Sequence, residues 1–317
     1  MPKLAGFALV LIFLIVLFGE GSKRIQDDKP KAIPSKIRPQ SPPRQHQRRR
    51  PGPRFWVKQT EDWGSGDAVS KRRDFPGYND PTSRQGVIRD RKIKSDATVG
   101  TVFAVAPNRI WLTARHVVDN CREAVVHGGL NDAGKPYLKV VRITLHPRAD
   151  VAIVTTVPSQ NQRTAFELAA DPVSATEAFH IGFPAGKPGA VHSRFLGRQS
   201  MHRRGPRGYT EEVLVWAEIT RIPGRSGSLG GLSGGAVIDS TGAVIGSNSA
   251  ENRRRGRIMT SSPKSLRQVA ALAGFTTQTA APGRFRNPNL NARDYPSVAK
   301  SLIQSRQVAR LLCKVKK

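Results

Sequence analysis

The feature that most constrains the fold is the pattern of short apolar segments between about Asp96 and Gly274. Short runs of β-branched and apolar residues alternate there with turn signals. The expected strands cover residues 99–105, 110–113, 124–126, 138–145, 151–156, 178–182, 193–196, 213–219, 236–239, 243–246 and 257–260. This pattern predicts an all-β domain, either a sandwich or a barrel.

One helix is expected in the same segment, over residues 263–273. Ser262 stands at the N-cap position, Pro263 is the first helical residue, and Gly274 follows the end. Serine at the N-cap, proline at the first position and glycine after the last are the usual boundary signals of a helix. The sequence therefore predicts a single short helix close to the end of the all-β segment.

Two polar residues at strand ends have the properties of a catalytic pair. His116 follows the strand 110–113, and Asp150 immediately precedes the strand 151–156. A histidine that is neutral near pH 7 and rigidly placed can act as a general base, and a carboxylate on its other ring nitrogen fixes its tautomer. Asp119 is the nearest competing carboxylate, and we expect it to be a loop or helix-cap residue.

A third segment, Gly-Leu-Ser-Gly-Gly over residues 231–235, carries a candidate nucleophile. Glycines on both sides of Ser233 let the backbone fold tightly around an exposed hydroxyl. The amides of Gly231 and Ser233 are the expected oxyanion hole, in which one donor is worth roughly 100- to 1,000-fold in rate. A glycine-rich hairpin turn without catalytic function is the alternative interpretation of this segment.

The order His116, Asp150, Ser233 inside an all-β segment resembles the chymotrypsin-like (trypsin-like) serine proteases, especially bacterial exported members akin to the HtrA group. The resemblance covers residues 96–274, and residues 180–184 (His-Ile-Gly-Phe-Pro) also look like a second-barrel segment of such proteins. It implies two six-stranded antiparallel β-barrels with the active site between them. It also implies a serine endopeptidase that hydrolyses peptide bonds of a protein or peptide substrate through an acyl-enzyme.

Three departures from this family limit what the resemblance implies. Animal digestive members have an aspartate where this chain has Leu232, so activation by pairing with a new N-terminus is not expected. Gly227 stands where an acidic pocket base would define trypsin-like specificity, so cleavage after Lys or Arg is not supported. No PDZ segment is recognisable after the barrel domain.

The N-terminal part predicts export. Lys3 precedes an unbroken apolar run over residues 4–18, which matches a secretory signal and is shorter than the roughly 20 residues that cross a bilayer. We expect residues 1–21 to be a signal peptide, or an uncleaved anchor through which residues 4–18 contact the membrane; a buried core helix is the third alternative. The expected location is the periplasm or the extracellular space.

Residues 22–95 are expected to be a basic, Pro/Arg-rich linker and lead-in. The part up to about Pro53 contains almost no branched apolar residues, so it is expected to be disordered. Part of this segment, residues 55–95, is either a lead-in that packs on the domain or more linker. The protease domain is expected over residues 96–275, with a C-terminal extension over residues 276–317. An apolar stripe over residues 298–312 predicts a helix that packs on the domain or rests on an anionic membrane.

The chain contains two cysteines, Cys121 and Cys313. In an oxidising compartment an even number of cysteines favours a disulfide, and two free thiols are the alternative. The closed loop would include most of the chain, and in the chain-entropy model such a loop stabilises the fold by about 5 kcal/mol at most. We therefore expect Cys313 to tether the C-terminal extension to the domain.

The formal net charge of +29 is spread over the whole chain and does not indicate one binding face. Such a charge attracts nucleic acid, phospholipid headgroups and acidic polysaccharides without specificity. No basic motif interleaved with aromatic residues is present, so no specific nucleic-acid partner is expected. A catalytically inactive protein of the same fold, which binds polyanions or envelope components through its basic surface, is the main alternative to the protease.

The residues outside the three segments predict no metal and no cofactor. No metal-ligand spacing relates the remaining histidines, which are expected to be structural or solvated: His46, His127, His146, His180, His192 and His202. The run Arg253–Arg255 is expected to be a solvated charge run, with a role in substrate binding as the alternative. Nothing in the sequence indicates an oligomeric state.

Overall fold

The computed structural model describes residues 86–89, 97–107, 109–127, 137–159, 164–171, 173–204, 208–224, 227–277 and 290–315. All described residues belong to one compact unit, which lies within residues 58–317. The expected signal or anchor (1–21) and almost all of the expected linker (22–95) lie outside the described residues.

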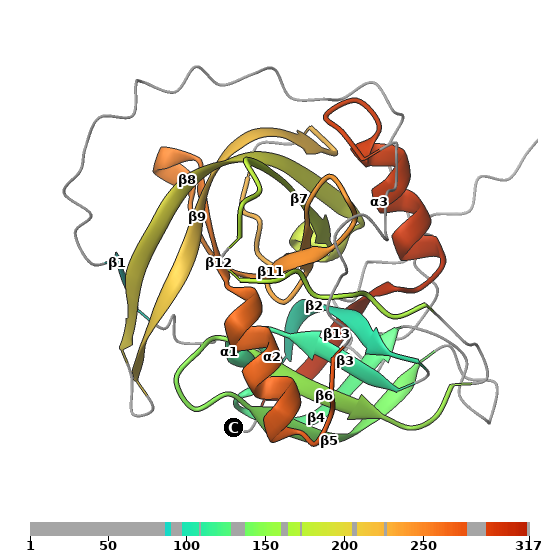
Figure 1. Cartoon of the computed structure of the whole chain (residues 1–317). Helices are drawn as coiled ribbons and strands as arrows, with labels where there is room; N and C mark the ends of the chain where they lie inside the picture. The colour runs from blue at the N-terminus through green and yellow to red at the C-terminus, as the bar shows by residue number, and fades with distance from the viewer. Residues whose placement is uncertain are drawn as a thin grey trace, which may run out of the picture. The chain divides into compact units, whose positions relative to one another are not determined.

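The first barrel is a closed, antiparallel sheet in the order β13-β2-β3-β6-β5-β4 (Figure 1). Its strands are β2 (Ala97–Ala106), β3 (Ile110–Thr113), β4 (Cys121–His127), β5 (Leu138–Leu145), β6 (Ala152–Thr156) and β13 (Val308–Val315). The first five of these strands were expected from the sequence, with ends that differ by a few residues.

Strand β13 corrects the expectation for the C-terminal region. The predicted helical stripe over residues 298–312 is wrong in its second half, because Val308–Val315 pairs with both β2 and β4 and closes the first barrel. The boundary expected at residue 275 therefore falls inside the pair of barrels. Ala309 and Leu311 point into the barrel interior while Val308 packs outside it, which is the period-two alternation of a strand buried on both sides.

The second barrel closes in the order β8-β7-β10-β11-β12-β9, because β8 also pairs with β9. Its strands are β7 (Glu177–Gly182), β8 (Gly189–Arg204), β9 (Tyr209–Ile222), β10 (Ala236–Ile238), β11 (Val244–Asn252) and β12 (Arg257–Ser261). Strand β1 (Gly86–Arg89) adds in parallel to the end of β8, in register with Met201–Arg204. The prediction of two six-stranded antiparallel barrels is confirmed.

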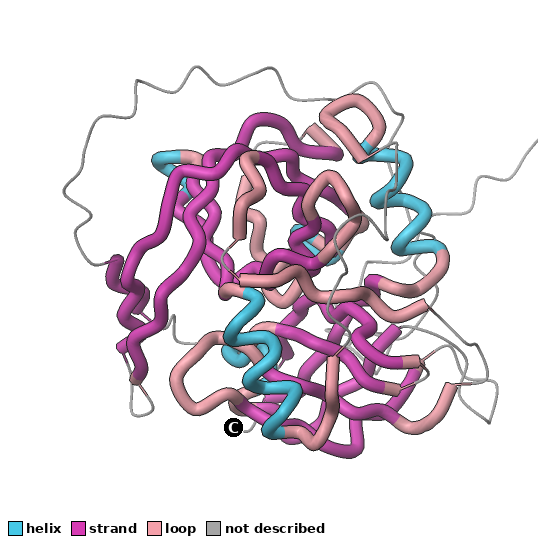
Figure 2. Tube along the Cα trace, in the orientation of Figure 1, coloured by secondary structure: helices cyan, strands magenta, loops and turns pink. Residues whose placement is uncertain are grey.

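The described helical segments are short (Figure 2). They are α1 (Arg115–Val118), α2 (Pro263–Leu272), α3 (Tyr295–Gln304) and the 3-10 turns η2 (Pro184–Gly186) and η3 (Arg253–Arg255). Helix α2 is the one predicted over residues 263–273, and it contacts β5, β6 and β11. None of the helices in the described ranges is long and apolar enough to cross a membrane.

One large hydrophobic cluster contains residues of both barrels, beside separate clusters inside each barrel. Alternate residues of each strand point into their own barrel or toward the other one: in β3, Trp111 lies in the first-barrel interior, whereas Ile110 and Leu112 join a cluster that also contains Phe179 and Ile181 of β7. Complete burial of one such side chain contributes about 1.5–3 kcal/mol. The relative position of the barrels is therefore set by the same strands that form them.

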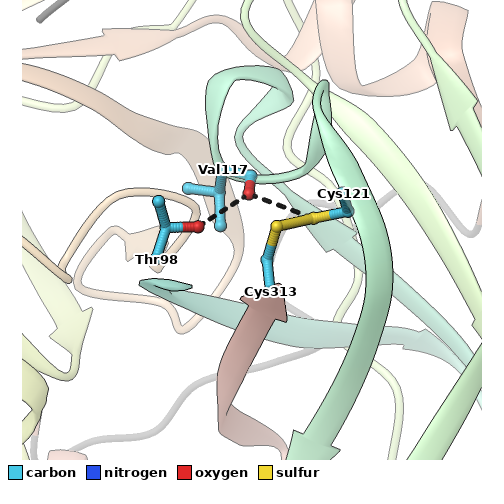
Figure 3. Close-up of a disulfide and its surroundings, with 4 residues drawn as sticks. All are labelled: Thr98, Val117, Cys121 and Cys313. Atoms are coloured by element: carbon cyan, nitrogen blue, oxygen red, sulfur yellow. Dashed lines mark hydrogen bonds between the residues drawn. A yellow bond between two sulfur atoms is a disulfide. The ribbon is translucent and has the colours of Figure 1, made fainter. Parts of the chain in front are cut away.

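The disulfide between Cys121 and Cys313 joins β4 to β13 (Figure 3). The two Cα atoms are 5.5 Å apart, and Cys313 lies opposite Ala124 in the sheet. Near the bridge, the Thr98 hydroxyl donates to the Val117 carbonyl at 3.3 Å. Cys121 Sγ is 3.6 Å from the same oxygen, and as a disulfide sulfur it has no proton to donate. The expected disulfide thus joins two paired strands of the first barrel, one of which is the last strand of the chain.

Candidate active site

His116 and Asp150 are directly paired. His116 lies in α1, the single turn after β3, and Asp150 ends the loop between β5 and β6. The His116 amide donates to Asp150 Oδ1 at 2.9 Å, and His116 Nδ1 is 2.7 Å from Asp150 Oδ2. An ionised carboxylate only accepts hydrogen bonds, so Nδ1 carries the proton and Nε2 is left as the acceptor.

Arg115 connects helix α1 to the loop that leads to Asp150. Its guanidinium donates to the carbonyl oxygens of His146 at 2.9 Å and Pro147 at 3.1 Å, in the loop that leads to Asp150. Asp119, the competing carboxylate, lies 3.7 Å from Arg115 Nε, in an ion pair within its own turn. The carboxylate that contacts His116 is therefore Asp150, and Asp119 is a residue of the α1 turn.

The Asp150 side chain is fully buried and accepts hydrogen bonds from several donors. Besides His116, Ser249 Oγ donates to Oδ2 at 2.5 Å and Arg203 Nη2 donates to the same oxygen at 3.0 Å. Burial opposes ionisation, but the charges and hydrogen bonds of His116, Arg203 and Ser249 outweigh it and lower the pKa of Asp150. Asp150 is thus held as a carboxylate.

The end of the β8–β9 hairpin forms a buried polar cluster behind Asp150. Arg203 comes from β8, and Tyr209 and Glu211 from β9. The Asp150 amide donates to Glu211 Oε2 at 2.7 Å, and the guanidinium carbons of Arg115 and Arg203 lie 4.9 and 6.0 Å from the centre of the Tyr209 ring. Burial raises the pKa of Glu211 to about 7, more than the hydrogen bond from Asp150 lowers it.

These cluster residues were not predicted from the sequence, and neither was Ser249. No common pattern in the sequence marks them, because Glu211 lies between two exposed polar residues and Ser249 follows two other polar residues. A buried polar residue needs a partner. For Ser249 and Glu211 that partner is Asp150, which lies in the other barrel.

The loop of Ser233 packs against the strand end that leads to His116. The Thr101 amide donates to the Ser233 carbonyl at 2.9 Å, and the Thr113 hydroxyl donates to the Thr101 carbonyl at 2.7 Å. Gly234 has φ of 83°, and a Cβ there would lie 2.3 Å from the Thr101 oxygen and 2.7 Å from the Ala114 nitrogen. Only glycine allows this approach of the two segments.

The glycine at 231 is required for the same reason. Its φ is 97°, and a Cβ would lie 2.4 Å from the Phe183 carbonyl oxygen. The Gly231 carbonyl accepts a hydrogen bond from the Thr101 hydroxyl at 2.7 Å, whereas the amides of Gly231 and Ser233 donate to no residue in the described part of the chain. Both amides are therefore available to an external acceptor.

Ser233 and His116 are not joined by a hydrogen bond among the described residues, in contrast to His116 and Asp150. Ser233 is half-buried and lines a pocket. Hydrogen bonds of catalytic groups are often long in free enzymes and shorten when substrate binds. The structure thus brings two of the three expected residues into direct contact and places the third on an adjoining loop.

His180 supports the serine loop from the second barrel. Its ring is 2.7 Å from Asn248 Oδ1 and 2.7 Å from Ser193 Oγ. Asn248 in turn accepts from the Gly234 amide at 2.8 Å through its carbonyl and donates to the Gly235 carbonyl at 3.1 Å. Burial lowers the pKa of His180 to about 4, so this histidine is neutral and structural.

The other expected residues fall outside this constellation. Leu232, at the position that is acidic in animal digestive enzymes, is buried in the second-barrel core. Arg253–Arg255 form the exposed turn η3. The described residues contain no group of three or more His, Cys, Asp or Glu side chains that could hold a metal ion.

The part of the chain that forms this site is similar to known proteins. Residues 100–246 match the family model of the trypsin-like peptidase domain. No curated protein is significantly similar to the chain. Similar solved structures include the inactive form of the Rv3671c protease of M. tuberculosis, at 21% identity and a TM-score of 0.42, which covers 56% of this chain and 88% of that chain.

Another similar structure is the protease domain of MamO from Magnetospirillum magneticum, at 17% identity and a TM-score of 0.39, with coverage of 54% of this chain and 93% of that chain. The family model includes the segments of His116, Asp150 and Ser233, and the two closed barrels are those that the resemblance implied. Residues 100–246 thus match a trypsin-like peptidase domain over somewhat less than half of the chain, and this match supports a protease as the class of this protein.

Proposed function

We propose that this protein is a serine endopeptidase with His116, Asp150 and Ser233 as its catalytic triad. The observation that carries the proposal is the 2.7 Å contact between His116 Nδ1 and a buried, ionised Asp150, which leaves Nε2 free to accept a proton. The close approach of the Ser233 loop to Thr113 and Ala114, which precede Arg115 and His116, supports it further.

The reaction follows from these roles. His116 accepts the Ser233 proton as Oγ attacks the carbonyl carbon of the scissile peptide bond, and the amides of Gly231 and Ser233 stabilise the oxyanion. When the tetrahedral intermediate collapses, the C–N bond breaks and His116 gives its proton to the leaving amine. Water, deprotonated by His116, then hydrolyses the ester on Ser233 and regenerates the enzyme.

Labelling with a fluorophosphonate tests the proposal. We expect the purified protein to be labelled at pH 8, and Ser233→Ala and His116→Ala to lose the label, because only an activated serine reacts. Ser200→Ala, which changes an exposed serine of β8, is the control and should be labelled like the wild type. Absence of labelling in a folded wild-type protein would instead favour the inactive binding protein that uses its basic surface for polyanions.

We also propose that the protein is exported. The apolar run over residues 4–18 and the disulfide between Cys121 and Cys313 support this location, since disulfides persist in oxidising compartments. Fusion of residues 1–30 to a reporter that is active only outside the cytoplasm should give reporter activity. The same fusion with charged residues in the 4–18 run should give none.

A further inference from the structure

A pocket adjoins Ser233 on the second-barrel side of the site. Its lining consists of Leu229, Gly230, Leu232, Ser233, Asn248, Ala250, Glu251 and Ile258. Because the nucleophile itself lines this pocket, the substrate side chain next to the attacked carbonyl is the one that can enter it. Most of the lining is apolar, and Glu251 is its one charged residue.

Glu251 is held with its carboxylate toward the Ser228–Leu229 segment. Ser228 Oγ donates to Oε1 at 2.5 Å, and the Leu229 amide lies 3.0 Å from both carboxylate oxygens. Among the described residues, the shared bond from Leu229 is therefore the only one that Oε2 accepts. A carboxylate oxygen accepts about two hydrogen bonds, so Oε2 can accept another from a ligand in the pocket.

No cation in the described residues neutralises Glu251 by an ion pair. The nearby Arg221 is already engaged: it is bonded to Glu218 through Nε and Nη2 and donates to the Gly227 carbonyl at 3.1 Å. The pocket next to Ser233 thus combines apolar walls with one negative charge that no cation of the described residues pairs with. Lys and Arg side chains have the complementary form, an apolar stem with a cationic end.

We infer that Glu251 makes the protease selective for Lys or Arg at the residue whose carbonyl is attacked. This inference rests on the proposed serine endopeptidase function. It replaces the expectation drawn from Gly227, because the negative charge reaches the pocket from β11 and not from the segment before the serine. Glu251 is a specificity residue and takes no part in bond cleavage.

Cleavage of matched peptides that differ only at this residue tests the inference. We expect wild-type protein to cleave the Lys and Arg peptides with the highest kcat/KM, and Glu251→Gln to lower these values by roughly 10- to 100-fold, the range for loss of a hydrogen bond to a charged group. The kcat/KM for a Leu peptide should change less than about threefold. Glu212→Gln, an exposed carboxylate of β9, is the matched control.

Glu251→Gln keeps a carbonyl oxygen that can accept the hydrogen bond from the Leu229 amide, so we expect the pocket wall to be preserved. The midpoint of thermal unfolding should then be the same as in the wild type. Glu251→Asp provides a second variant that keeps the charge and should retain the preference for basic residues. An equal loss of activity on the Leu peptide would overturn the inference. So would a wild-type preference for acidic residues, as expected if Arg253–Arg255 selected the substrate.

Binding of p-aminobenzamidine, a fluorescent cation, separates this inference from the proposed function. In Ser233→Ala, which cannot turn over substrate, we expect binding that Glu251→Gln weakens at least tenfold and Glu212→Gln leaves unchanged. Fluorophosphonate labelling without such binding would reject the role of Glu251 and keep the protease. Glu251-dependent binding in a wild-type protein that is not labelled would keep the cation pocket and reject the protease.

Discussion

At the scale of single residues, strand β8 contains two arginines that allow a comparison: Arg203 forms a buried ion pair, and Arg198 forms an exposed one. Arg203 pairs with Asp150 at 3.0 Å with side chains 9% and 0% exposed, whereas Arg198 pairs with Glu212 at 2.8 Å with side chains 32% and 63% exposed. Removal of Arg203 takes one donor from a buried carboxylate, but water can replace Arg198.

We therefore expect Arg203→Met to lower the free energy of unfolding by about 1–3 kcal/mol. Arg198→Met, the control, should lower it by less than about 1 kcal/mol. Urea denaturation at pH 8 followed by circular dichroism measures both values, and Arg203→Lys should recover part of the loss. Equal effects of the two methionine variants would show that the ion pair with Asp150 has no special role in stability.

Glu211 predicts a dependence of stability on pH. Because its pKa rises from the ordinary 4.5 to about 7 in the folded protein, Glu211 binds a proton on folding between these pH values. Its contribution to the free energy of unfolding therefore falls as the pH rises from about 4.5 to about 7, by at most about 1.4 kcal/mol per pH unit.

Glu211→Gln keeps an acceptor for the Asp150 amide and removes this titration. Its urea midpoint should fall less than that of the wild type, or rise more, as the pH increases over this window. The neighbouring Glu212→Gln, at an exposed position of β9, should behave like the wild type. Parallel pH profiles for the wild type and Glu211→Gln would contradict the assignment of the raised pKa to Glu211.

At the scale of elements, closure of the first barrel depends on β13, the last strand of the chain. Strand β13 lies between β2 and β4, and the disulfide joins it to β4 across a sequence separation of 192 residues. The bridge reduces the freedom of the unfolded chain over this long loop. We expect the double variant Cys121→Ala, Cys313→Ala to lose about 3–5 kcal/mol of unfolding free energy in guanidinium titrations.

A reducing agent provides the control for this prediction. It should destabilise the wild type by a similar amount and leave the double variant unchanged, because the variant has no bridge to reduce. If the oxidised wild type and the variant unfolded at the same denaturant concentration, the pairing of β13 with β2 and β4 would by itself account for barrel closure.

At the scale of the whole molecule, the cluster shared by the two barrels predicts that they unfold as one cooperative unit. Trp111 is buried in the first barrel and Trp216 in the second, and the cluster between them draws residues from both. We expect Trp111→Phe and Trp216→Phe to retain a single unfolding transition, with fluorescence and far-ultraviolet circular dichroism midpoints that coincide. Two separate midpoints in either variant would show that the barrels unfold independently.

The local patterns of the sequence determined most of the fold. Short apolar runs with turn signals marked the strands from β2 to β12, although β8, β9 and β11 are longer than expected. They also marked helix α2, because burial and capping are local requirements that each segment shows in its own residues. The segments of His116, Asp150 and Ser233 were recognisable because each combines a reactive side chain with a strand end or a glycine-rich turn.

Only the tertiary structure decided which distant residues meet. Strand β13 was expected to continue a helix, since both of its faces are buried and its apolar residues follow directly on those of α3; its partners β2 and β4 lie far away in the sequence. Arg203, Ser249 and Glu251 reach the site from strands of the second barrel. Their roles depend on the register of the strands and on the packing of the two barrels. A single stretch of sequence does not specify which distant residues it will contact.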